Sequence, residues 1–138
     1  MVKIKLRRYP YDVAKDRRTP AVCAQFHHAS ELIGRRWTGA IIYVLLRSRC
    51  RFAMLREAIP DITDRMLSER LQELELEGIV ERTVIPEIPV RVEYSLSVKG
   101  RELASAFDAI SVWAQKWVSL IPSEVPAAAA RSHNRRRR

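Results

Sequence analysis

Cysteines, long apolar runs and an export signal are scarce or absent in this chain of 138 residues. Its two cysteines, Cys23 and Cys50, are too few for a disulfide framework and suit a reducing compartment. No apolar run approaches the roughly 18–20 residues that span a bilayer, and the start, with Lys3 and Lys5, is unlike a secretory signal. We therefore expect a cytoplasmic protein with no membrane partner.

Catalytic and metal-binding motifs are also missing. The sequence contains no Gly-rich phosphate loop, no nucleophile-elbow motif and no His/Cys/Asp group with catalytic spacing. His27 and His28 are adjacent, so on a helix they would point about 100° apart and could not bind one metal together. The carboxylates between Glu69 and Glu81 alternate with arginines, as on a solvated helix face. We predict no enzymatic activity, no cofactor and no metal.

The net charge of +9 is concentrated at the two ends of the chain. Residues 1–18 contain seven Lys/Arg and two Asp, and residues 122–138 contain five Arg and one Glu, whereas residues 19–121 carry 13 basic and 13 acidic side chains. We predict a basic N-terminal arm over 1–20, one domain over 21–121 and a Pro/Ala/Arg-rich tail over 122–138. Such arms supply salt-dependent affinity for phosphates, although a tail with no dedicated partner is the alternative.

The chain is organised around a predicted helix between Thr63 and Gly78. Thr63 is a good N-cap and Gly78 a natural C-terminal stop. Leucines recur at i, i+4 and i+7, which indicates one buried stripe: Leu67, Leu71 and Leu74. The other face can hydrogen-bond base edges or phosphates: Asp64, Arg65, Ser68, Glu69 and Gln72. Such a helix, about 20 Å long, fits a DNA major groove, and a plain solvated face is the alternative.

The flanking patterns predict a winged helix. Helices are expected over 23–33, 38–47, 52–58 and 98–120, a very short strand over 51–52, and longer strands over 79–85 and 91–96. The helix over 38–47 is apolar on nearly every side and should form the buried centre. A short helix, a tight turn and a helix with a polar outer face form a helix-turn-helix, and the hairpin adds the wing. The predicted class is mainly α with a small β-hairpin (α+β).

Separated motifs, in this order, resemble the HxlR-type, MarR-like winged-helix transcription regulators. The motifs are Glu31–Thr38, Arg51–Phe52 with Leu55, Asp61–Leu71, Leu74, Glu77–Arg82, Pro86–Leu96 and Lys99–Gly100. The resemblance covers about residues 23–120. It implies a homodimer, formed through the first and last helices, that binds a palindromic operator in double-stranded DNA and acts as a repressor or an activator. It leaves any small-molecule effector unknown.

The resemblance assigns contacts by position. Residues facing the major groove would be Thr63, Asp64, Arg65, Ser68, Glu69 and Gln72, and backbone contacts would come from Arg36, Arg51 and Arg91. The dimer interface would include Phe26, Phe107, Ile110, Trp113 and Trp117. The last helix carries more apolar surface than a small core can cover, which also favours an interface. Trp37 is expected in the core, and Arg70 is expected to pair with Glu73 or Glu77.

Cys23 lies where many relatives carry a cysteine that in some of them senses oxidants or electrophiles. A helix N-terminus favours the thiolate, the nucleophilic form. We therefore predict Cys23 as a possible redox sensor, with a packed small residue as the alternative, since Ala24 replaces the proline common in relatives. Cys50 is expected to be structural. An alternative function is a non-specific architectural nucleic-acid binder that works through its arms.

Overall fold

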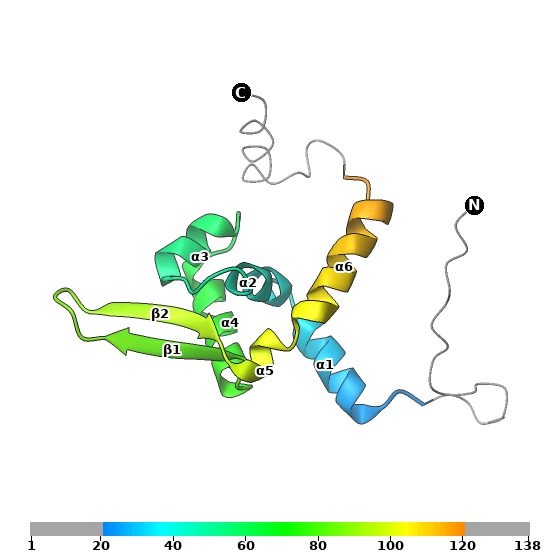
Figure 1. The fold of residues 1–138 in the computed structure, drawn as a ribbon, viewed down its shortest axis with the longest axis horizontal. Helices are drawn as coiled ribbons and strands as arrows, with labels where there is room; N and C mark the ends of the chain where they lie inside the picture. Colours follow the sequence, from blue (N-terminus) through cyan, green and yellow to red (C-terminus); the bar gives the residue numbers. More distant parts are fainter. Residues whose placement is uncertain (1–20, 121–138) are drawn as a thin grey trace.

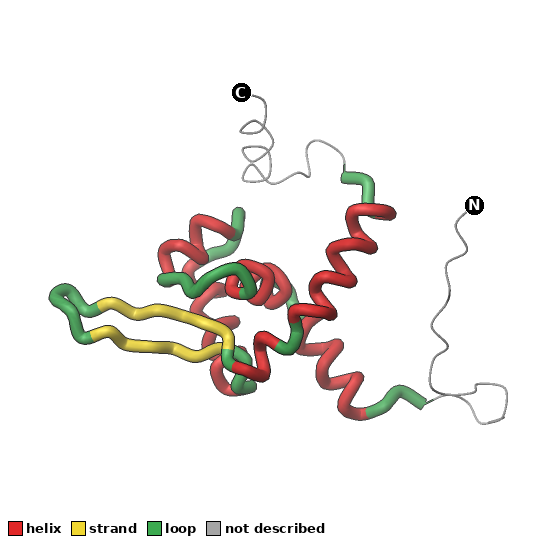
Figure 2. Tube along the Cα trace, in the orientation of Figure 1, coloured by secondary structure: helices red, strands yellow, loops and turns green. Residues whose placement is uncertain are grey.

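Six helices and one hairpin make up residues 21–120, the part of the chain that this computed structural model describes. The arm and tail predicted over 1–20 and 122–138 lie outside the described residues. The elements are α1 (Ala24–Gly34), α2 (Thr38–Leu45), α3 (Phe52–Ala58), α4 (Asp64–Leu76), β1 (Val80–Ile85), β2 (Arg91–Leu96), α5 (Val98–Arg101) and α6 (Ala104–Trp117). The hairpin projects on one side, and α1 and α6 lie on the other (Figures 1 and 2). The predicted class, mainly helical with a small hairpin, is confirmed.

The core gathers around α2, as its apolar sequence predicts. Ile41 and Ile42 are fully buried, and Leu45 is buried with them. They pack with buried side chains from the other elements: Leu55, Ile59, Ile62, Leu67, Leu71, Leu74, Ile79, Val80 and Leu96. Full burial of one such side chain contributes about 1.5–3 kcal/mol. The set therefore holds α2, α3, α4 and the base of the hairpin as one unit.

The α3–turn–α4 unit follows its local sequence signals. The α3 helix spans Phe52–Ala58, as the sequence predicts, and Asp61 in the turn adopts a positive φ of 66°. The Thr63 hydroxyl accepts a hydrogen bond from the Met66 amide at 3.2 Å, which caps α4. Gly78, with φ 72°, ends the helical path in the left-handed region that glycine adopts without strain. The predicted helix-turn-helix is thus confirmed.

The hairpin pairs β1 and β2 antiparallel, from Val80 opposite Leu96 to Ile85 opposite Arg91. The very short strand predicted over 51–52 is wrong. Buried Cys50 instead forms an isolated bridge with Tyr94, exchanging two backbone hydrogen bonds of 2.9 and 2.8 Å. Arg51 is already the N-cap of α3, so no residue is left for a strand. The structural role expected for Cys50 is confirmed.

The long last helix predicted over 98–120 is interrupted. Ser97 caps α5 by accepting from the Gly100 amide at 3.1 Å, but the helix ends at Arg101 and α6 starts at Ala104. A Cβ on Gly100 would overlap the Ile79 carbonyl, so this turn packs directly on the base of β1. The Leu103 amide then bonds to the Gly100 carbonyl, a tighter turn than an α-helix makes. Periodicity cannot reveal this bend, because both pieces have the same helical spacing.

Candidate nucleic-acid interface

The α4 helix presents the face that its sequence predicts. Leu67, Leu71 and Leu74 are at most 1% exposed. The opposite side chains include five exposed ones, with Glu69 half-buried beside them: Thr63, Asp64, Arg65, Ser68 and Gln72. Since buried leucines fix the rotation of α4, its polar face has one defined direction. The first turns of α4 can therefore hold hydrogen-bonding groups against a base edge.

Ion pairs cover the exposed N-terminal half of α4. Arg65 Nε donates to Glu69 Oε1 at 3.0 Å, and Arg56 Nε, from the last turn of α3, donates to Asp64 Oδ1 at 2.8 Å. The Arg65 and Asp64 side chains are 87% and 76% exposed. Exposed pairs contribute only about 0–1 kcal/mol, so an incoming phosphate or base can replace a partner. Sequence reasoning missed Arg56, because its position beside Asp64 depends on the turn between the helices.

The C-terminal half of α4 carries a more enclosed network. Arg70 Nη1 donates to both carboxylate oxygens of Glu73 at 2.8 Å, and Arg70 Nε donates to the Arg36 carbonyl at 3.0 Å. Arg35, the C-cap residue of α1, also donates to Glu73, at 2.6 Å. Burial acts to raise the pKa of Glu73, but the hydrogen bonds and charges of Arg35 and Arg70 outweigh it and lower that pKa. The expected pairing of Arg70 with Glu73 is confirmed.

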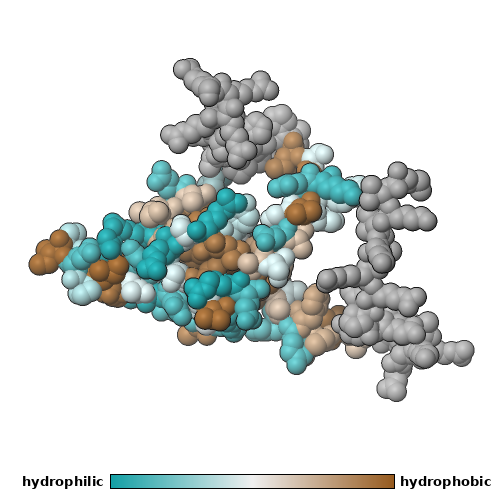
Figure 3. All heavy atoms as spheres, viewed as in Figure 1, coloured by the Kyte–Doolittle hydropathy of each residue, from teal (hydrophilic) through white to brown (hydrophobic). Residues whose placement is uncertain are grey.

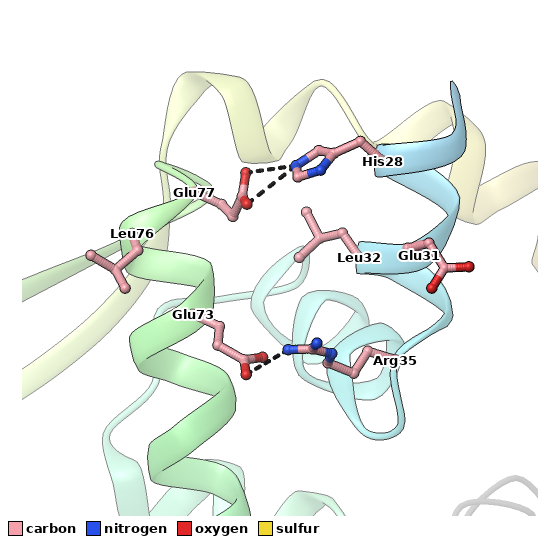
Figure 4. Close-up of a pocket in the computed structure, with 7 residues that line it drawn as sticks. All are labelled: His28, Glu31, Leu32, Arg35, Glu73, Leu76 and Glu77. Atoms are coloured by element: carbon pink, nitrogen blue, oxygen red, sulfur yellow. Dashed lines mark hydrogen bonds and ion pairs between the residues drawn. The ribbon is translucent and has the colours of Figure 1, made fainter. Parts of the chain in front are cut away.

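A groove between α1 and α4 lies beside this network. It has a volume of about 390 Å³ and is lined by His28, Glu31, Leu32, Arg35, Glu73, Leu76 and Glu77. Figure 4 shows Arg35 reaching Glu73 across one end and His28 reaching Glu77 across the other. His28 Nε2 lies 3.2 Å from Glu77 Oε1. The groove therefore ties α1 to α4 by two polar contacts on either side of Leu32.

The three arginines predicted to contact the DNA backbone differ in their surroundings. Arg36 is exposed and stacks on Trp37 at 4.7 Å, while Arg51 is exposed at the N-cap of α3. Trp37 itself is half-buried against the core, as expected. Arg91 is half-buried between two carboxylates, with Nη2 at 3.4 Å from Glu87 and Nε at 3.3 Å from Glu93. That Nε makes no hydrogen bond in spite of the short distance.

The predicted dimer residues fall into two groups. Phe26, Ile110, Trp113 and Trp117 are between 54% and 67% exposed. Phe107 is only 7% exposed and packs in the core of its own chain, and the assignment of all five residues to a dimer interface stays a prediction. Phe107 therefore faces inward from α6, whereas Ile110, Trp113 and Trp117 of the same helix stay outside the core. Figure 3 shows apolar surface both around α6 and at the tip of the hairpin.

The two cysteines lie in opposite environments. Cys23 is exposed at the N-cap of α1, and its thiol donates to Gln25 Oε1 at 2.8 Å. Packing within its own chain is therefore not the role of Cys23.

Within residues 21–120 no group of His, Cys, Asp and Glu is arranged to hold a metal, and no helix there is both long and apolar enough to cross a bilayer.

Comparison with known proteins gives concordant results. Residues 32–122 match the HxlR-like helix-turn-helix family. The chain is 47% identical over 97 residues to YvaP, an uncharacterized HTH-type transcriptional regulator of Bacillus subtilis. The aligned region covers 70% of this chain and 90% of YvaP. The reduced form of the B. subtilis regulator YodB superposes with a TM-score of 0.65 at 43% identity, covering 72% and 97% of the two chains. Quinone-bound YodB gives 0.61 at 41% identity, covering 70% and 100%.

Proposed function

This chain belongs to the HxlR-like helix-turn-helix family, and from that premise we propose that it is a sequence-specific DNA-binding transcriptional regulator. The observation that supports this best is the α4 helix, whose buried leucines fix an exposed, hydrogen-bonding face beside a projecting hairpin. Helix-turn-helix proteins place such a helix in the major groove, with its N-terminal residues at the base edges. A regulator of this kind acts where the chromosome lies, so we assign it to the cytoplasm.

Base contacts and backbone contacts come from different parts of this surface. Arg65 is the best base reader, because its guanidinium is exposed near the N-terminus of α4 and guanine accepts two hydrogen bonds from arginine. Thr63, Ser68, Glu69 and Gln72 lie on the same face and complete the set of polar contacts. Arg36, Arg51 and Arg91 would bind phosphates, which positions the protein without adding sequence information.

A homodimer completes the assembly. Trp113, Trp117 and Ile110 form an exposed apolar face on α6, and Phe26 of α1 is also exposed. Contiguous apolar surface of this kind marks an interface in soluble proteins. A two-fold dimer presents two copies of α4, so its operator should be a palindrome with half-sites about one helical turn, roughly 34–36 Å, or a small multiple apart.

Selection of bound fragments from a random DNA pool tests this function. The full-length protein should enrich a palindrome, and light scattering should give two chains per complex. Enrichment without any common motif would contradict the proposal. Such a result would favour the second candidate, an architectural binder, which is supported by the +9 net charge concentrated outside residues 19–121. A chain trimmed to 19–121 should keep the palindrome if it is a regulator and lose DNA binding if its arms do the work.

Cys23 would supply a redox or electrophile response. Three points support this: its thiol is exposed, it lies at the start of α1, and the similar YodB structures include reduced, diamide-treated and quinone-bound forms. Diamide or a quinone should therefore change the operator affinity of the wild-type protein but not that of Cys23→Ser. The matched control is Cys50→Ser, whose buried position should leave the response in place. An unchanged wild type, or a response that survives Cys23→Ser, would exclude this role.

A further inference from the structure

The ion pair between Arg56 and Asp64 joins the two helices of the helix-turn-helix. Arg56 lies in the last turn of α3 and Asp64 in the first turn of α4, with Nε 2.8 Å from Oδ1. Their side chains are 44% and 76% exposed. Arg56 is thus a cation at the entrance to the predicted reading face, and no sequence motif assigned it a role.

Stability does not require this pair. An exposed ion pair contributes little to stability, because water screens its charges and holding two side chains in one geometry costs entropy. Asp64 is already favoured in the first turn of a helix by the helix dipole, and Thr63 caps the same turn. Buried side chains, including Leu55, Ile59 and Ile62, hold α3 against the rest of the core. The pair can therefore open without loosening either helix.

The pair also makes the reading face electrically neutral. Two cations, Arg56 and Arg65, are matched there by two anions, Asp64 and Glu69. A phosphate that approaches this face meets a carboxylate beside each guanidinium, so non-specific attraction is weak. In the major groove, however, a carboxylate can accept a hydrogen bond from the amino group of cytosine. The effect of the carboxylate on the binding free energy therefore depends on the DNA sequence.

We propose that Arg56 is a DNA contact that exchanges partners, binding Asp64 in the free protein and a backbone phosphate in the complex. The exchange frees Asp64 to accept a hydrogen bond from a base amino group. The first helix of a helix-turn-helix crosses the DNA backbone, which places Arg56 of α3 on the phosphate side. On DNA without that amino group, Asp64 stays unpaired near phosphates. Arg56 and Asp64 together therefore increase the preference for operator DNA over other sequences, an inference that rests on the proposed function.

The salt dependence of DNA binding separates the phosphate contact of Arg56 from the base contact of Asp64. Anisotropy titrations would use the selected operator and a scrambled duplex with the full-length protein. Arg56→Gln should weaken binding to both duplexes and reduce the salt slope by about one unit per subunit, because one phosphate contact is lost. Arg56→Lys should keep the slope, since it keeps the charge. Asp64→Asn should strengthen binding to the scrambled duplex and lower the operator preference by roughly five- to tenfold.

A matched control lies at the other end of α4. Lys99 is an exposed cation whose Nζ donates to the Glu77 carbonyl at 2.5 Å, so Lys99→Gln removes one charge there and keeps a donor. It should leave both slopes unchanged. Thermal unfolding of each variant should stay close to that of the wild type, since the Arg56–Asp64 ion pair and the Lys99 side chain are both exposed.

Two results would overturn the inference. An unchanged salt slope for Arg56→Gln would mean that Arg56 never reaches a phosphate. Equal loss of affinity for both duplexes in Asp64→Asn would mean that Asp64 only supports the helix. If the wild type itself preferred no sequence, the proposed function would fail as a whole. The salt slope on the scrambled duplex would still decide whether Arg56 binds phosphate.

Discussion

The winged-helix body from α2 to α5 and the outer helices α1 and α6 all contain many apolar residues but use them differently. Within residues 21–120, every buried core hydrophobic lies between Ile41 and Leu96 except Phe107. The α1 helix contains no buried residue, and α6 leaves Ile110, Trp113 and Trp117 exposed. The body thus closes its own core, whereas the outer helices carry apolar surface that a second chain can cover. Stability and assembly are therefore separable by mutation.

Leu71→Ala should have the largest effect, because it opens a cavity in the closed body. Leu71 is 1% exposed, and buried leucine-to-alanine changes cost about 2–5 kcal/mol. Denaturant unfolding should show this loss, and operator binding should fall with it. Leu76 is the matched control on the same helix, since it is 90% exposed and its change to alanine should cost less than about 0.5 kcal/mol. Equal losses for the two leucines would contradict the comparison.

Trp113→Glu should disrupt the dimer contact made by the outer helices without unfolding the body. The substitution places a charge on the exposed apolar face of α6, so light scattering should give a monomer that keeps its circular-dichroism spectrum. Operator binding should weaken by about 30-fold or more, because removing an aromatic interface anchor commonly costs about 2 kcal/mol or more. Val98→Glu changes an exposed residue of α5 and should leave the dimer intact. A folded dimer carrying Trp113→Glu would refute the assigned interface.

Arg65→Ala should alter DNA reading while leaving both regions intact. Loss of a bidentate contact to guanine should reduce operator affinity by about 1–3 kcal/mol and relax one position in each half-site. Binding to a scrambled duplex should change little. Arg91→Ala is the comparison variant: as a phosphate contact it should weaken all sequences alike and lower the salt slope by about one per subunit. A uniform loss for Arg65→Ala would show that Arg65 clamps the backbone instead.

Glu73→Gln should have the smallest effect, at the junction of the two regions. Glu73 joins Arg35, at the C-cap of α1, to Arg70 of α4, and its pKa is lowered in the folded protein. A lowered folded-state pKa adds stability above the usual value of 4.5, and that stability is lost as the pH falls through the folded-state pKa. The variant should therefore lose only about 1 kcal/mol near neutral pH, because glutamine keeps a hydrogen-bond acceptor for the two arginines. Unfolding measured from pH 7 to pH 3 should show a shallower acid decline than the wild type.

Much of the body was predictable because its signals are local. The α3 helix, the Thr63 cap, the leucine stripe of α4 and the Gly78 stop all depend on neighbouring residues. The outer helices were less predictable. One helical period runs through residues 98–120, so the break at Glu102 and Leu103 had no local signal. Gly100, just before this break, packs against Ile79, and that contact joins residues far apart in the chain.

Charge partners show the same division between local and long-range information. Arg65–Glu69 and Arg70–Glu73 lie one helical turn apart, so sequence spacing alone brings them together. Arg56–Asp64 and Arg35–Glu73 connect different helices, and their distances follow from how the helices pack. Arg91 was expected to be available for phosphate, yet the turn of the hairpin brings Glu87 beside it and the strand brings Glu93.

Local sequence signals predict the winged helix and the direction of the α4 face, because periodicity, caps and turn residues act over a few positions, while the family follows from the resemblance of its motifs. The packed fold places Phe107 in the core, leaves Trp113 and Trp117 outside it, and brings Arg56 against Asp64. Those outcomes depend on which surfaces meet once the hydrophobic core has formed. Burial and ion pairing are properties of that packed arrangement, and no short stretch of sequence contains them.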